Sequence, residues 1–169
     1  MYDELRESVT AGALLVVVSA LAVATGRTFL FPSLGPSAFL LATKPAAPAS
    51  HPRRVFGGHV LGVLAGLAAY HALASGVAVT APPPAMTIAS ASLAVSGVLS
   101  VVLTTAGMVR FDLRHAPACA TTLIVSLGLL SSPTDALLVV ASILLLLATH
   151  RVLVAAEIAP VRTVADRPS

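Results

Sequence analysis

The chain has 169 residues, of which 57% are hydrophobic and only 10% are charged. A soluble domain carries about 25% charged residues, so this composition excludes an ordinary water-soluble protein. The net charge of +3 does not indicate nucleic-acid binding, since the few basic residues fall in short linkers and tryptophan is absent.

Four apolar segments are long enough to cross a bilayer, because about 20 helical residues cover its ~30 Å hydrocarbon core. We predict long helices over residues 8–25, 55–77, 86–109 and 135–155. The link 80–85, with three consecutive prolines, is expected to be a tight turn. Thr134 or Asp135 is the expected N-cap of the last helix.

Two further apolar segments, residues 29–43 and 116–131, are too short for ordinary spans. About 15 residues extend only roughly 23 Å as a helix. Pro36 and Pro117 suit the first turn of a helix, where the missing N–H is not needed. We therefore expect each segment to be an extended entry followed by a short helix that begins near its proline. Whether these segments cross or re-enter stays open.

The distribution of Lys and Arg favours six crossings. If both short segments cross, nine of the ten Lys and Arg residues lie on one side, and Arg27 lies alone on the other. If neither crosses, the split is four against six. Because cytoplasmic loops carry the excess of Lys and Arg, we predict a multi-pass protein of the plasma (inner) membrane with both termini in the cytoplasm.

A weak internal repeat accompanies this pattern. A shift of 81 positions places Gly26 on Gly107 and Pro36 on Pro117. We predict an all-α membrane protein of four long transmembrane helices and two short broken or re-entrant helices, arranged as an inverted repeat. Residues 1–158 would form this single domain, and residues 159–169 a disordered cytoplasmic tail. Inverted repeats with discontinuous helices recur in transporters, with the site near the bilayer midplane.

In such a repeat the starts of the two short helices face a common centre. Helix N-termini present unpaired N–H groups and partial positive charge, which favour an anion. The alternative is a pair of packed hairpins and histidines that only fill the bundle. The predicted substrate-binding residues at this centre are Gly35, Pro36, Ser37, His59, His115, Ala116, Pro117 and Ala118.

Two other features have both a functional and a plain interpretation. His51, Arg53 and Arg54 would form a basic entrance to the site, or only a positive-inside anchor. Gly58, Gly62 and Gly66 recur every four residues, a spacing that permits close helix packing. That packing would lie within the subunit or in the homo-oligomer that we predict.

Three stretches resemble the HPP family of small membrane proteins. Gly35-Pro36-Ser37-Ala38 with Leu40-Leu41 is similar to that family's GASAVLL segment. The stretch from His51 to His59, HPRRVFGGH, is similar to its QPRNxxGGH segment, and the stretch from His115 to Thr121, HAPACAT, is similar to its HPPAGAT motif. The departures of this chain from the second and third of these motifs are His51, Arg54, Ala116 and Cys119.

The resemblance implies a transporter, and nitrite is a candidate substrate because some HPP proteins have been linked to nitrite transport. The family is usually described with four spans, which differs from the six predicted here. We therefore expect transport of a small inorganic anion, passively or together with protons, in a lipid bilayer. The alternative is a non-transporting membrane sensor or partner-binding subunit. The sequence indicates no enzyme, cofactor, metal site or nucleic-acid partner.

Overall fold

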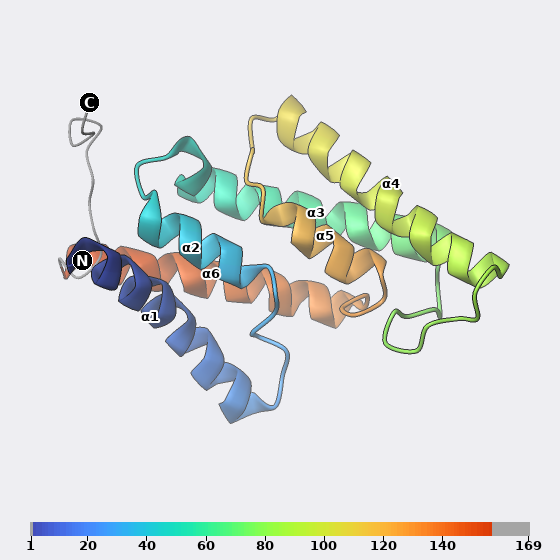
Figure 1. Cartoon of the computed structure of the whole chain (residues 1–169), viewed down its shortest axis with the longest axis horizontal. Coiled ribbons are helices and arrows are strands. Elements are labelled where there is room, and N and C mark those ends of the chain that lie inside the picture. Colours follow the sequence, from blue (N-terminus) through green and yellow to red (C-terminus); the bar gives the residue numbers. More distant parts are fainter. Residues whose placement is uncertain (1, 157–169) are drawn as a thin grey trace.

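The structure is a computed structural model that describes residues 2–156. Within them the fold is helical, with one isolated β-bridge between Ala78 and Ala81. In chain order the helices are α1 (Tyr2–Thr25), α2 (Leu34–Thr43), the short 3-10 helix η1 (Pro48–Ser50), α3 (Pro52–Leu73), α4 (Ile88–Arg110), α5 (Ala118–Ser126) and α6 (Pro133–Ala155), as Figure 1 shows. The expected disordered tail, residues 159–169, lies outside the described residues.

The four long helices lie where the apolar segments predict them. α1, α3, α4 and α6 are each long and apolar enough to cross a membrane. α3 is the central helix of the four, because 44% of its apolar stretch is buried, against 17% for α1. The predicted class of four long apolar helices with two short ones is confirmed.

Three local expectations were wrong. The N-cap of α6 is Ser132 rather than Thr134 or Asp135, because Ser132 and Asp135 form a reciprocal capping box and Pro133 fits the first helical position. α3 ends at Leu73 rather than at residue 77, and Gly76 follows in the left-handed region at φ 82°. The link from residue 74 to residue 87 is consequently a longer loop than the tight turn expected over 80–85.

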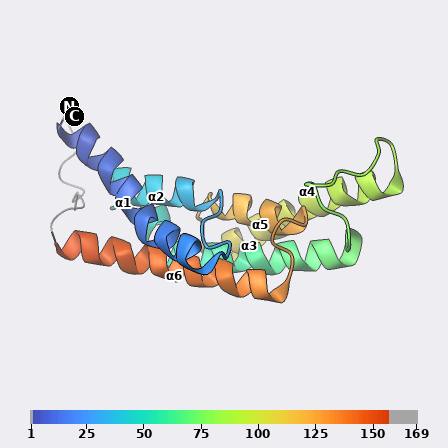
Figure 2. The ribbon, with the colours of Figure 1, turned by 90° about the horizontal axis from the view of Figure 1, so that it is seen from below.

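The two short helices begin beside each other in the middle of the molecule. Both views show α2 and α5 near the centre, running toward opposite ends (Figures 1 and 2). The Ser33 hydroxyl at the start of α2 lies 2.7 Å from the Thr121 hydroxyl in the first turn of α5. The order long, short, long therefore occurs twice along the chain, whereas the inverted symmetry of the two halves stays a prediction.

The glycine face of α3 packs inside the subunit. A Cβ added at Gly62 would lie 2.7 Å from the carbonyl oxygen of Ala118, and one at Gly66 would lie 2.7 Å from the Cβ of Val125. Gly58 similarly faces His115 and Ala118. The glycines thus let α3 approach α5 closely, so this face is not available to a second copy of the chain.

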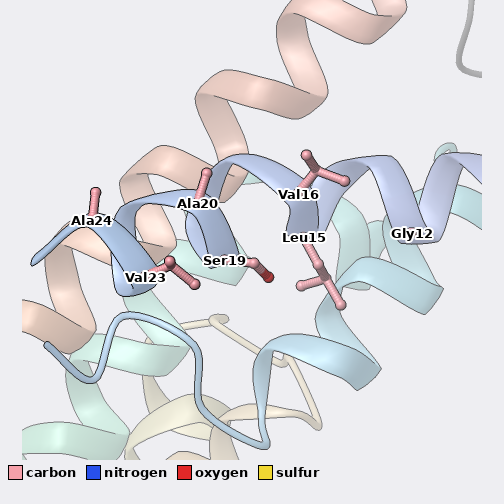
Figure 3. A pocket seen from close by; sticks show the side chains of 7 residues that line it. All are labelled: Gly12, Leu15, Val16, Ser19, Ala20, Val23 and Ala24. Carbon is pink, nitrogen blue, oxygen red and sulfur yellow. The ribbon is translucent and has the colours of Figure 1, made fainter. Parts of the chain in front are cut away.

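Much of the outer surface is apolar, as a bilayer requires. An open hollow of about 550 Å³ runs along α1 (Figure 3). Its lining is small or apolar: Gly12, Leu15, Val16, Ser19, Ala20, Val23 and Ala24. Lipid tails suit such a surface.

Candidate functional site

A buried cluster of hydroxyls and imidazoles lies where α2, α3 and α5 meet. The hydroxyl oxygen of Ser37 lies 3.0 Å from Nε2 of His59 and also 3.0 Å from Nε2 of His115. Nδ1 of His59 lies 2.6 Å from the hydroxyl of Thr121, which in turn lies 2.7 Å from that of Ser33. We call these five residues the Ser–His cluster.

Each side chain of the cluster has at most 1% of its surface exposed. The two imidazole rings pack edge to face with their centroids 5.0 Å apart. Burying polar groups in a membrane protein is unfavourable unless they are hydrogen-bonded, and polar residues at this depth are functional candidates by default.

The local sequence explains how the rings are placed. Ser37 is in the first turn of α2, and its hydroxyl oxygen also lies within hydrogen-bond distance, 3.1 Å, of the carbonyl oxygen of Ser33. His59 lies two turns into α3, beside Gly58 and Gly62, whose missing side chains leave room for the start of α5. His115 lies three residues before the first residue of α5 and donates from Nδ1 to the carbonyl of Ala49 at 2.8 Å, which fixes its ring against η1.

The backbone at the start of α5 does not offer free donors. The N–H groups of Ala118, Cys119 and Ala120 donate to the carbonyls three residues earlier, each at 3.0 Å. A tight 3-10 turn therefore satisfies groups that we expected to await an anion. The polar side chains of the Ser–His cluster, rather than these amides, are the chemistry that this centre presents.

A family model of the HPP transmembrane region matches residues 2–164. The chain belongs to the HPP family. No curated protein and no solved structure shows significant similarity to it. The three stretches that resemble this family meet in the cluster: the first supplies Ser37, the second supplies His59, and the third supplies His115 and Thr121.

Not all the predicted site residues of this HPP protein lie in the cluster. Gly35, Pro36 and Ala116 are exposed, on the outer side of the helix starts. Pro117 and Ala118 are buried, and Ala118 packs against Gly58 and Gly62 of α3. Among the predicted residues the structure joins Ser37, His59 and His115 by direct hydrogen bonds.

Sequence reasoning missed three groups of the site, which are Ser33, Thr121 and the carbonyl of Ala49. Ser33 lies one helical turn before Ser37, and Thr121 lies one turn after Pro117. Hydroxyls at that spacing inside apolar segments were the available signal for the first two. Nothing in the sequence indicates the Ala49 carbonyl, because any residue carries one.

The predicted basic entrance of the HPP protein has a counter-charge. His51, Arg53 and Arg54 line a hollow of about 280 Å³ together with Pro48 and Asp112. Arg54 forms a 2.7 Å ion pair with Asp112, and Arg53 donates to the carbonyl of Phe111 at 3.2 Å. The hydrogen bond from Arg54 holds the pKa of the Asp112 carboxyl below its usual value. The hollow is therefore not purely cationic.

Only one short turn separates this hollow from the buried rings. Pro48, the first residue of η1, lines the hollow, and the carbonyl of the next residue, Ala49, accepts the bond from His115. Within residues 2–156 no three His, Cys, Asp or Glu side chains gather in an arrangement that would hold a metal ion.

Proposed function

We propose that this protein carries a small inorganic anion across the membrane and that the anion binds at the Ser–His cluster. The observation that supports this most is the position of Ser37, whose hydroxyl reaches both imidazoles at 3.0 Å at the common start of two short helices. The positive ends of both helices favour negative charge at that point. Nitrite is the first substrate to test, because membership of the HPP family favours it.

The closed state of the cluster is compatible with a carrier. A carrier alternates access to a central site, so the site is occluded in part of its cycle. Moving η1 away from His115 would connect the cluster to the hollow beside Arg53 and Arg54.

One observation favours the alternative, a non-transporting sensor or partner-binding subunit. The cluster's side chains bond directly to one another, as they would in a network that serves only to lock helices together. Holding helices together with two buried imidazoles is unfavourable, because both rings must be desolvated, whereas a packed apolar interface would hold the helices without that free-energy cost. We therefore prefer the carrier.

The test is anion flux into liposomes that contain the purified protein. Nitrite, nitrate, formate and chloride are offered in turn, and uptake is compared with protein-free vesicles. We expect His59→Ala to lower flux at least tenfold while the protein remains folded in detergent. His71→Ala is the matched control, because His71 lies on the same helix but is exposed, and this variant should keep wild-type flux. Absence of flux for all four anions in the wild type would overturn the carrier.

A further inference from the structure

The hydrogen-bond partners of the Ser–His cluster determine where its protons are. A carbonyl oxygen only accepts, so Nδ1 of His115 carries a hydrogen, which it donates to Ala49. If His115 is neutral, its Nε2 is then an acceptor. The donor to it is the hydroxyl of Ser37, which lies 3.0 Å away.

The same reasoning fixes the rest of the cluster. Because the Ser37 hydrogen is used toward His115, the Ser37 oxygen accepts from Nε2–H of His59. Nδ1 of His59 is then an acceptor for the Thr121 hydroxyl, which accepts from the Ser33 hydroxyl. With both rings neutral, every ring nitrogen has a partner and every hydroxyl hydrogen points in one direction along the chain of bonds.

A second hydrogen-bond acceptor for Ser37 allows the cluster to take up one additional proton. The carbonyl of Ser33 lies 3.1 Å from the Ser37 hydroxyl oxygen and competes for its hydrogen. If His115 gains a proton at Nε2, it donates to the Ser37 oxygen, and the Ser37 hydroxyl turns to Ser33. The Ser37 oxygen then accepts from both imidazoles and donates to one carbonyl, so the network is again complete without movement of any heavy atom.

A second added proton has no such place. It would sit on His59, whose ring centroid is 5.0 Å from that of His115, so two like charges would repel at short range in a site of low dielectric. It would also force the Thr121 hydroxyl to turn from Nδ1 of His59 to the Ser33 oxygen, and the Ser33 hydrogen would then lose Thr121 as its acceptor. The cluster is therefore built to hold one proton or none.

The elements around the cluster supply no permanent charge that could replace this added proton. Within the described residues, α2 and η1 have no titratable side chain, α5 has only Cys119, and α4 has only Arg110 at its end. On α3, Arg53 and Arg54 are at the first turn and Tyr70 and His71 at the last, and α6 has Asp135 near its start with His150 and Arg151 near its end. In the α4–α5 link, Asp112 is paired with Arg54 and Arg114. Among residues 2–156, the only aromatic ring that packs against His59 or His115 is that of the other histidine.

We propose that the Ser–His cluster binds its anion together with one proton on His115, so that transport is an electroneutral symport of one proton per monovalent anion. This rests on the proposed function. An anion entering a neutral buried site would remain an uncompensated charge, whereas the imidazolium formed on His115 balances it. The proton comes from water on the side of entry and returns to water on the other side with the anion.

The test measures charge and protons in the same liposomes. Nitrite and nitrate are the probes, a trapped pH dye reports proton movement, and valinomycin with potassium gradients sets the membrane potential. We expect one proton to enter with each anion, above the rate of protein-free vesicles, and the initial rate to change less than twofold between opposite potentials. Nitrate is the decisive probe, because its conjugate acid is too strong to cross the lipid by itself.

The outcomes separate this inference from the proposed function. Anion flux that follows the potential without proton entry would overturn the symport and leave the carrier standing. Absence of flux for nitrite, nitrate, formate and chloride alike would overturn both the carrier and the symport. In His115→Gln, which keeps an N–H donor near Ala49, we expect proton-coupled uptake to fall at least tenfold. If that variant fails to fold, the number of protons that the wild-type protein takes up per anion still tests the proposal.

Discussion

Ser33 and Thr121, 88 positions apart in the chain, share a hydrogen bond of 2.7 Å between their hydroxyl oxygens. This bond joins the start of α2 to the first turn of α5, and Thr121 passes the connection on to His59 at 2.6 Å. The first and second halves of the chain thus meet through side chains that lie entirely within the protein.

Replacing the Thr121 hydroxyl should destabilise the bundle. Thr121→Val keeps the shape but leaves Nδ1 of His59 without a donor, and an unsatisfied buried polar atom costs about 1–3 kcal/mol. Thr121→Ser keeps the hydroxyl and should lose less. Thermal unfolding in detergent measures both. Equal midpoints for Thr121→Val and Thr121→Ser would show that the hydroxyl contributes nothing.

The contact between α3 and α5 predicts a loss of stability in Gly62→Ala. The added Cβ would lie 2.7 Å from the Ala118 carbonyl, and overpacking of this kind typically costs about 1–3 kcal/mol. Gly12→Ala is the control, because a Cβ there meets nothing within 4 Å and alanine favours the helix. We expect a lower unfolding midpoint only for Gly62→Ala. A change of oligomeric state without destabilisation would instead indicate that this glycine face lies at an interface between subunits.

Six crossings predict that the two ends of α5 lie on opposite sides of the membrane. The link before α5 contacts the start of α3 through Asp112 and Arg54, whereas the residue after α5, Leu127, accepts from the N–H of Val79 beyond the end of α3. In a Cys119→Ser background, Ala46→Cys and Thr134→Cys place thiols at exposed positions in the α2–α3 link and at the start of α6. An impermeant thiol reagent should label them from opposite sides, Ala46→Cys from the cytoplasm. Labelling of both from one side would favour four crossings.

Acid should weaken the contact between Arg54 and Asp112. Because the hydrogen bond from Arg54 lowers the pKa of Asp112 in the folded protein, its contribution to stability is present above the unfolded pKa of about 3.9 and is lost as pH falls through the folded value. The unfolding midpoint of Asp112→Asn should therefore converge with that of the wild type at low pH. Salt should reduce the difference at neutral pH, since Asp112 is half-exposed. A difference that persists unchanged into strong acid would contradict this assignment.

Two hydroxyls on one face of α4 should respond differently to removal. Ser100 donates to Gly97 and to the Ser126 hydroxyl at 2.9 Å, so Ser100→Ala should cost about 0.5–1.5 kcal/mol. The Thr104 hydroxyl is fully buried without a hydrogen-bond partner, so Thr104→Val should be neutral or stabilising. The thermal unfolding midpoints of the two variants, compared with that of the wild type, test this prediction. A large loss in Thr104→Val would reveal a partner, such as a bound water, for that hydroxyl.

The sequence by itself determined the membrane-spanning elements and the starts of the two short helices. Long uncharged segments have no stable alternative to helices in a bilayer, because every backbone polar group must be satisfied internally. Proline at positions 36 and 117 restricts the backbone locally, and the helices do begin within two residues of them. The motifs also singled out Ser37, His59 and His115, since polar residues are rare in such segments.

Only the tertiary structure decided how these residues meet. The bond between Ser33 and Thr121 and the carbonyl of Ala49 depend on the packing of separate helices, which no local pattern encodes. The glycine face of α3 had two interpretations from its spacing, and the close approach of α5 selected one of them. The amides at the start of α5 were expected to be free until the 3-10 turn showed their partners. Local sequence preferences determine which segments are helical. The hydrogen-bond partners of the buried side chains are determined by contacts between segments that lie far apart in the chain.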